Sequence, residues 1–271
     1  MNAIDSSYGI YAAETASTEL EIALEELRWQ GFHILRDVLT PDEIREGADR
    51  LDAVLANQEE EFGLENLDRI SDRNLARVPL AYDPWFLKVA THPRVLAVAR
   101  ALIGDHIILH TQNGILNPSD AVHHQSKWHR DIPYQEWTSS RPIAMATLFC
   151  FDDFSPKTGG TYVLPFSQKF DKFPSEHYVG AHELPVTAPA GSAIMFDAML
   201  YHRAGSNSSG KIRRGVNNVF ATPILKQQID IPRMLGPDFP ENDEMARFLG
   251  YTTVVRESVR DYRANKLKRL P

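Results

Sequence analysis

The stretch Trp128-His129-Arg130-Asp131, together with the distant His202, gives the strongest indication of fold and chemistry. We expect this stretch to be a strand, in which residues i and i+2 face the same side, so the His129 imidazole and the Asp131 carboxylate can converge on one point. His202 follows His129 by 73 residues (202 − 129 = 73). Two imidazoles and one carboxylate on one face of an iron ion, with three coordination positions open, form the facial triad of non-haem Fe(II) oxygenases. The spacing therefore predicts an Fe(II) site held by His129, Asp131 and His202, with Asp120 or Asp197 as the alternative carboxylate.

An arginine placed to hold an anion strengthens this prediction. Arg213 follows His202 by 11 residues (213 − 202 = 11), beyond a turn between two glycines and at the start of an apolar run. If His202 ends one strand and Arg213 begins its antiparallel neighbour, the guanidinium comes near the metal. Its planar fork would then bind the distal carboxylate of 2-oxoglutarate through two hydrogen bonds. Arg214 alternates to the opposite face of the strand and is the weaker candidate.

The rest of the second half favours strands, and the first half favours helices. Short apolar or alternating runs separated by Gly, Pro, Asn, Asp and Ser clusters are typical of a β-sandwich or barrel. They cover residues 107–111, 144–151, 160–164, 193–196 and 215–221. Apolar residues at the helical period predict helices over 17–29, over 41–56 after the N-cap Thr40, and over 84–102, with one short strand at 32–35. We therefore expect a mainly β, single-domain fold over residues 1–271, with N-terminal helices on one side of the sandwich and a solvated C-terminal helical extension over about 237–271.

Composition excludes several classes of protein. The 271 residues carry 29 Lys and Arg against 36 Asp and Glu, a net charge of −7, which argues against a general nucleic-acid binder. No apolar run approaches the roughly 20 residues that cross a bilayer, and the N-terminus lacks the basic start of a signal peptide. The single cysteine, Cys150, excludes an intramolecular disulfide and a Cys-rich metal site. We expect a cytoplasmic protein that binds neither nucleic acid nor membrane.

Several segments resemble the phytanoyl-CoA dioxygenase-like family of Fe(II)/2-oxoglutarate oxygenases. Residues 30–44 (QGFHILRDVLTPDEI) resemble its opening segment, and the His-x-Asp stretch matches its metal-binding motif. Residues 158–169 and 189–197 are similar to two further family segments, although a Gly-Ser-His element reads Phe166-Ser167-Gln168 here. The similarity runs from about residue 23 to 222 in the family's order. It implies a double-stranded β-helix core of the jelly-roll or cupin type, and conversion of 2-oxoglutarate and O₂ to succinate at Fe(II).

The resemblance also implies residues that contact the cosubstrate. Gln112 and Asn117, on the strand before the His-x-Asp motif, would be polar residues facing the pocket. Many relatives carry a hydroxyl two residues after the distal histidine, where this chain has Ala204. The missing hydrogen bond would come from another residue, such as Thr147 or Tyr134.

Taken together, the sequence predicts an Fe(II)- and 2-oxoglutarate-dependent dioxygenase that oxidises, by default hydroxylates, a C–H bond of a small-molecule metabolite. Two alternatives stay open. One is a cupin-type metal enzyme that needs no 2-oxo acid, and the other is a non-catalytic barrel that only binds a metabolite or partner. Arg213 argues against the first alternative and the intact triad against the second. The substrate and the oligomeric state are not determined by the sequence.

Overall fold

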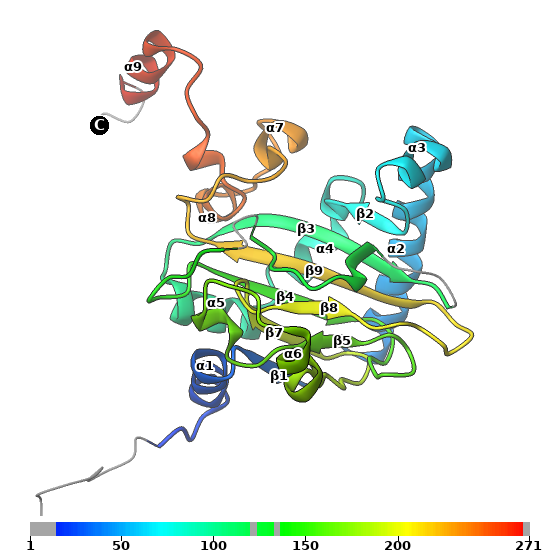
Figure 1. Ribbon diagram of the computed structural model, residues 1–271. Helices are drawn as coiled ribbons and strands as arrows, with labels where there is room; N and C mark the ends of the chain where they lie inside the picture. The colour runs from blue at the N-terminus through cyan, green and yellow to red at the C-terminus, as the bar shows by residue number, and fades with distance from the viewer. Residues whose placement is uncertain (1–14, 120–123, 133–135, 268–271) are drawn as a thin grey trace, which may run out of the picture.

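Two antiparallel sheets form the centre of the protein in the computed structural model, which describes residues 15–119, 124–132 and 136–267. The strands are β1 (Phe32–Leu35), β2 (Leu75–Arg77), β3 (Ile108–Asn117), β4 (Ala144–Cys150), β5 (Thr161–Val163), β6 (Leu184–Pro185), β7 (Ala193–Asp197), β8 (His202–Ala204) and β9 (Arg213–Ala221). The larger sheet has the order β1-β7-β4-β9-β3-β2, and the smaller one β6-β5-β8. The smaller sheet lies in front of the larger one in Figure 1.

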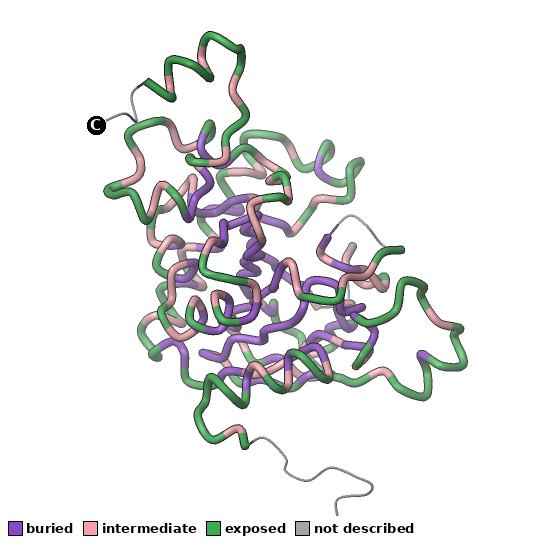
Figure 2. The backbone as a smooth tube through the Cα atoms, turned by 90° about the vertical axis from the view of Figure 1, so that its left-hand side faces the viewer, coloured by how far each residue is buried: buried purple, intermediate pink, exposed green. Residues whose placement is uncertain are grey.

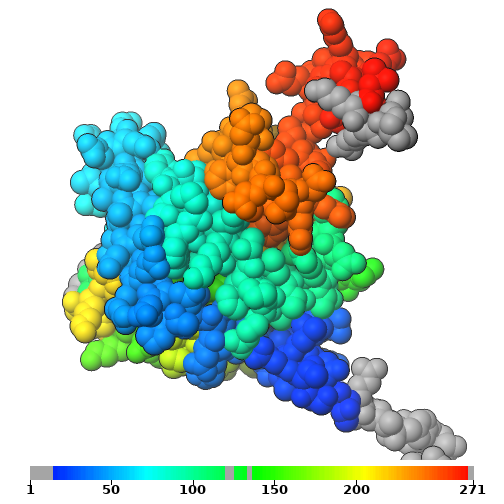
Figure 3. All heavy atoms as spheres, turned by 180° about the vertical axis from the view of Figure 1, so that it is seen from behind, coloured from blue at the N-terminus to red at the C-terminus, as the bar shows by residue number. Residues whose placement is uncertain are grey.

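N-terminal helices cover the outer face of the larger sheet (Figure 1), and in Figure 3 the blue to blue-green segments that contain them form much of the surface seen from behind. The α-helices of the described residues are α1 (Glu19–Trp29), α2 (Pro41–Phe62), α3 (Leu64–Arg69), α4 (Trp85–Ala90), α5 (Pro93–Ile103), α6 (Glu176–His182), α7 (Ile231–Leu235), α8 (Asp243–Phe248) and α9 (Val259–Leu267). None of the helices in the described part of the chain is long and apolar enough to span a membrane. The predicted fold class, mainly β with flanking helices, is confirmed.

The pleat of the strands divides the core into two layers. Along β4, Met145 and Phe149 pack against the helices, while Leu148 and Cys150 belong to the cluster between the sheets. Figure 2 shows that the buried residues gather in the middle of the molecule and the exposed ones at its periphery. Because alternate residues face opposite layers, the position of a residue along its strand decides whether its side chain can reach the interior between the sheets.

Three local expectations need correction. The helix predicted over residues 84–102 is two helices, α4 and α5, because the chain leaves the helical conformation at His92 (ψ 122°) before Pro93. The helix after Thr40 extends to Phe62, six residues beyond the predicted end (62 − 56 = 6), although its predicted capping box with Glu43 is confirmed. The His-x-Asp segment is not a strand; only His129 forms a single bridge, with His202.

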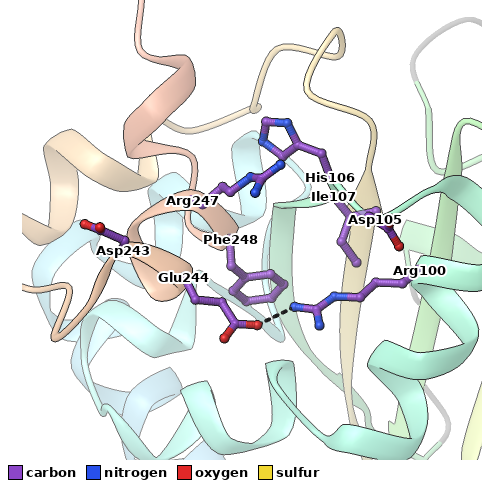
Figure 4. Close-up of a pocket in the computed structure, with 8 residues that line it drawn as sticks. All are labelled: Arg100, Asp105, His106, Ile107, Asp243, Glu244, Arg247 and Phe248. Carbon is purple, nitrogen blue, oxygen red and sulfur yellow. Dashed lines mark hydrogen bonds and ion pairs between the residues drawn. The ribbon is translucent and has the colours of Figure 1, made fainter. Parts of the chain in front are cut away.

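The C-terminal part is attached to the core more firmly than a solvated extension would be. Phe248 in α8 is 5% exposed, and its ring lies 6.1 Å from that of Phe220 in β9. Beside it, Arg100 of α5 and Glu244 of α8 form an ion pair of 2.7 Å at the edge of a surface pocket (Figure 4). By contrast, α9 has no buried residue and projects away from the body, in red in Figure 1.

We predict that the aromatic contact, and not the ion pair, holds α8 in place. Phe248→Ala should lower the free energy of unfolding by about 3–5 kcal/mol, because it removes a buried ring and leaves a cavity. Arg100→Ala should lower it by at most about 1 kcal/mol, because both partners of this pair are solvent-exposed. Urea unfolding of the two variants measures the difference, and effects of equal size would contradict this account.

Candidate metal centre

His129, Asp131 and His202 come together at one end of the space between the sheets. Their ligand atoms all lie within 4.8 Å of one another. His129 and His202 exchange two backbone N–H···O hydrogen bonds, each of 3.0 Å, and their ring centroids are 4.4 Å apart. Asp131 Oδ1 is 3.4 Å from His202 Nε2. The three residues that the sequence predicts as metal ligands therefore converge as expected.

Both imidazoles are held in the orientation that metal binding needs. His129 Nδ1 lies 2.8 Å from the carbonyl oxygen of Lys127, and His202 Nδ1 lies 3.0 Å from that of Leu200. Since a carbonyl oxygen only accepts, each Nδ1 carries the proton and each Nε2 keeps its lone pair for a metal. A ring nitrogen fixed by such a bond is typical of metal-binding histidines, so this pair of imidazoles fits an Fe(II) ion.

The electrostatics of the carboxylate also suit a cation. Burial disfavours the charged form of Asp131, but the neighbouring His202 and His129 imidazoles and a hydrogen bond from Asn217 outweigh it and hold the pKa of Asp131 below its ordinary value. Burial likewise disfavours charged His202, yet Asp131 raises the pKa of that imidazole. The carboxylate thus stabilises positive charge at the point where the imidazoles meet, which is what a divalent cation requires.

Arg130, between the two ligands of the motif, points the other way. Its guanidinium donates to the carbonyl oxygens of Trp137 (2.9 Å), Ser167 (3.1 Å) and Phe170, and it lies 4.0 Å from the ring centroid of Tyr201. These bonds anchor an irregular segment that has little backbone pairing of its own. Sequence reasoning missed this role. Alternation could have indicated it, because a residue between two ligands that face the metal must itself face the opposite side.

Arg213 lines the same cavity as the triad. It is 2% exposed, donates one hydrogen bond to the Gly159 carbonyl oxygen (2.9 Å), and lies 4.3 Å from the ring centroid of Phe154. Burial lowers the pKa of Arg213 to about 10, so the group is still a cation at neutral pH. Among the residues that the structure describes, no carboxylate forms an ion pair with it. A buried cation without a counterion is suited to bind an anion.

Arg214 faces the opposite layer, as the alternation predicts. Its guanidinium forms ion pairs with Asp52 of α2 (2.9 Å) and with Asp152 (3.1 Å). Its charge is therefore satisfied within the protein, on the side of the sheet that the helices cover.

Of the other residues predicted to contact the cosubstrate, Asn117 lies near Arg213. Asn117 lies opposite Arg213 in the β3–β9 ladder, and its Nδ2 donates to the carbonyl oxygens of Gly159 (3.2 Å) and Gly205 (3.0 Å). It therefore supports the loop that also binds Arg213. Tyr134 and Asp120 lie outside the described residues.

Gln112 and Thr147 instead face the helices. Gln112 accepts from the Leu80 N–H (2.9 Å) and donates to the Phe86 carbonyl oxygen (3.0 Å) and to Asn218 Oδ1 (2.8 Å). Thr147 lies between Met145 and Phe149, which both pack on the helix side of β4. This placement corrects the expectation that Gln112 faces the pocket, and it disfavours a cosubstrate contact for both residues, because the sheet separates them from the triad.

Two further polar residues bear on the carboxylate of the triad. Asn217, which sequence reasoning missed, donates from Nδ2 to Asp131 Oδ2 at 3.1 Å and lines the cavity. Asp197, the alternative carboxylate, is not part of the triad cluster. It is buried and accepts a hydrogen bond from the Met199 N–H (2.9 Å).

Comparison with known proteins identifies relatives of this chain. The family described as phytanoyl-CoA dioxygenase (PhyH) matches residues 27–215. An uncharacterized protein of Mycobacterium tuberculosis is 33% identical over 227 residues, which is 81% of this chain and 82% of the relative. The dioxygenase olcK of Penicillium canescens is 26% identical over 179 residues, which is 60% of this chain and 57% of the relative.

Solved structures share the fold. The epimerase SnoN, in complex with Fe³⁺, alpha ketoglutarate and nogalamycin RO, matches with a TM-score of 0.63 and 18% identity, over 82% of this chain and 93% of SnoN. EctD from S. alaskensis, with 2-oxoglutarate and 5-hydroxyectoine, matches with a TM-score of 0.63 and 20% identity, over 81% and 80% of the two chains. The predicted double-stranded β-helix is confirmed.

We predict that metal binding depends on both histidines. Under anaerobic conditions the protein should bind about one Fe(II) per chain, and His129→Ala or His202→Ala should abolish binding at low micromolar metal, because each removes one of three ligands. Equilibrium dialysis measures the stoichiometry. His182→Ala, at an exposed histidine, is the control. Unchanged affinity in both ligand variants would refute the site.

A second prediction concerns the buried carboxyl of Asp197. Burial raises its pKa from 3.8 to about 6, so the folded state binds a proton more tightly than the unfolded state. Its contribution to stability is therefore greatest at low pH and falls as pH rises from about 4 to about 6. Asp197→Asn should stabilise the protein above pH 6 by about 2–3 kcal/mol relative to wild type, and much less near pH 4. Urea unfolding at both pH values tests this, and a gain independent of pH would contradict it.

Proposed function

The chain belongs to the phytanoyl-CoA dioxygenase family, and we propose that it hydroxylates a C–H bond of a small-molecule metabolite while 2-oxoglutarate is converted to succinate. It is an Fe(II)- and 2-oxoglutarate-dependent oxygenase, with O₂ as the second cosubstrate. One observation carries the proposal: a His-Asp-His cluster and a buried guanidinium, which has no counterion among the described residues, line the same cavity.

The residues of the chain have separate tasks in this proposal. His129, Asp131 and His202 would hold the iron through Nε2, a carboxylate oxygen and Nε2. The bound iron supplies the activation of O₂ and the oxidation of the C–H bond. Because the chain provides three ligands, three further positions stay available to the cosubstrates. Asp131 takes the position that a halide would need, so hydroxylation is favoured over halogenation.

Arg213 supports a 2-oxo dicarboxylic acid as the cosubstrate. A guanidinium binds a carboxylate bidentately, and in a buried site such a pair is strong because water does not compete. The Gly159 carbonyl oxygen and the Phe154 ring already fix the guanidinium before an anion arrives. A cupin-type enzyme without a 2-oxo acid would have no use for a buried cation here.

The cavity walls support a C–H substrate. Ile115, Leu148 and Phe196 line it beside the triad, and such apolar side chains exclude water from the reacting centre. The molecules bound in the two similar structures, nogalamycin RO in SnoN and 5-hydroxyectoine in EctD, are small. They support a small-molecule substrate here without identifying it.

We predict that Arg213 governs cosubstrate affinity. Arg213→Ala should weaken 2-oxoglutarate binding on the order of a hundredfold or more, because removing one partner of a buried charged pair costs about 3–5 kcal/mol. Arg213→Lys should recover only part, because an ammonium lacks the planar fork. The measurement is a titration of the metal-to-ligand charge-transfer band of the anaerobic Fe(II) complex.

Arg214→Ala is the matched control for this titration. It removes the same side chain one residue away but on the helix side, so cosubstrate affinity should change little while stability falls. If Arg214→Ala weakened binding and Arg213→Ala did not, the clamp would be misassigned. If neither mattered, the 2-oxoglutarate role of this cavity would have to be abandoned.

The reaction itself is tested with a panel of candidate metabolites. A true substrate should raise succinate release above the uncoupled background and yield a product heavier by one oxygen atom. Asp131→Ala should abolish both signals, because the iron loses its anionic ligand. A product that has lost two hydrogens instead would replace hydroxylation by desaturation, and turnover that is independent of 2-oxoglutarate would refute the proposal.

A further inference from the structure

The carboxylate of Asp131 is held differently from the two imidazoles. His129 and His202 each bond to a backbone carbonyl oxygen two residues earlier, so their own segments orient them. Asp131 lies on an irregular segment, and its Oδ2 instead accepts a hydrogen bond of 3.1 Å from Asn217 Nδ2, a residue 86 positions away in β9. The orientation of this ligand therefore depends on a different element of the fold.

Asn217 is presented by a rigid part of the molecule. Strand β9 pairs with β3 on one side and with β4 on the other, and Asn217 lies opposite Asn113 and Leu148 in these two ladders. The residue is 6% exposed. Hydrogen bonding on both sides fixes the backbone of β9 at this point, so the side chain can hold a partner that lies on a less regular segment.

The chemistry of the pair fixes which way the amide points. An ionised carboxylate only accepts hydrogen bonds, so the NH₂ group of Asn217 must face Asp131. The amide oxygen Oδ1 then points away from Asp131, and within the described ranges it is buried without a hydrogen-bond partner. A buried acceptor without a partner costs stability. An apolar residue would avoid that cost, which indicates that the amide is kept for its bond to Asp131.

We propose that Asn217 is a positioning residue of the oxidation: its Nδ2 holds Oδ2 of Asp131 and thereby turns Oδ1 toward the imidazoles and the metal. Oδ1 is the oxygen that lies 3.4 Å from His202 Nε2. The proposal rests on the proposed function only in taking His129, Asp131 and His202 as the metal ligands. Substitution of a residue that hydrogen-bonds to a metal ligand commonly weakens metal affinity about tenfold to a hundredfold.

The test uses the full chain loaded with Co(II) in the absence of 2-oxoglutarate and substrate. Asn217→Leu keeps the size of the side chain but removes the donor, and it should weaken Co(II) binding about tenfold to a hundredfold and change the visible absorption bands of the cobalt. Asn217→Gln retains an amide at a different reach and should recover part of the affinity. If Asn217→Leu does not fold, Asn217→Ala takes its place with the same expected loss.

Asn218→Leu is the matched control. Asn218 is the next residue of the same strand, is fully buried, and accepts a hydrogen bond from Gln112 on the opposite face. Its loss perturbs the sheet without touching Asp131. It should lower the thermal stability while leaving the Co(II) affinity and spectrum as in wild type. If Asn217 had only a structural role, the two substitutions would change stability and Co(II) binding in the same way.

Two results would overturn the proposal. One is an Asn217→Leu variant with Co(II) affinity within about twofold of wild type and an unchanged spectrum. The other is an equal loss of affinity in Asn218→Leu, which would assign the effect to the sheet as a whole. A wild-type protein that binds no Co(II) would instead refute the metal centre on which the proposed function depends, so the two failures are distinguishable.

Discussion

The alternation of side chains along β9 is the constraint on which the site depends. Arg213 and Asn217 face the space between the sheets, whereas Arg214 and Asn218 face the helices. A shift of the pairing register by one residue would turn Arg214 and Asn218 into the cavity. It would also turn Arg213, the predicted ligand of the cosubstrate carboxylate, toward the helices. The register is protected because β9 is paired on both edges, with β3 and with β4. The chemistry is thus fixed by a strand that itself supplies none of the predicted metal ligands.

The triad also depends on contacts outside the sheets, because His129 and Asp131 lie on a segment that is not a strand. The reciprocal backbone bonds between His129 and His202 hold the motif beside the first residue of β8. Arg130 then anchors the reverse side of the same segment by donating to three backbone carbonyl oxygens. The two ligands and the arginine between them therefore form one unit, in which alternate side chains bind the metal and the scaffold.

The sequence predicted the residues whose chemistry and spacing are characteristic, and it missed a contact that arises only when distant elements come together. Alternation predicts that His129 and Asp131 share a side and that Arg213 and Arg214 face opposite sides, whereas His202 was predicted from the chemistry of the facial triad; the structure brings the three predicted ligands together. Gln112 was assigned to the wrong face because the assignment followed the family resemblance and not the alternation of side chains. Gln112 and Asn117 are five residues apart (117 − 112 = 5) in a regularly paired part of β3, so their side chains face opposite sides of the sheet. Asn217 was missed because its role arises from Asp131, a partner 86 residues away.

Adjacent arginines in β9 show how a structural charge differs from a functional one. Arg214 is paired with two carboxylates, so its charge is compensated as soon as the chain folds. Arg213 is more deeply buried and yet has only a neutral carbonyl oxygen and an aromatic ring within reach among the described residues. Burying an uncompensated cation opposes folding, and a carboxylate ligand that enters the cavity removes this opposition. By linkage, such a ligand stabilises the folded protein in proportion to the logarithm of its concentration above its dissociation constant. The charge of Arg213 therefore has two consequences: it lowers the stability of the core without a ligand, and it raises the affinity for a carboxylate.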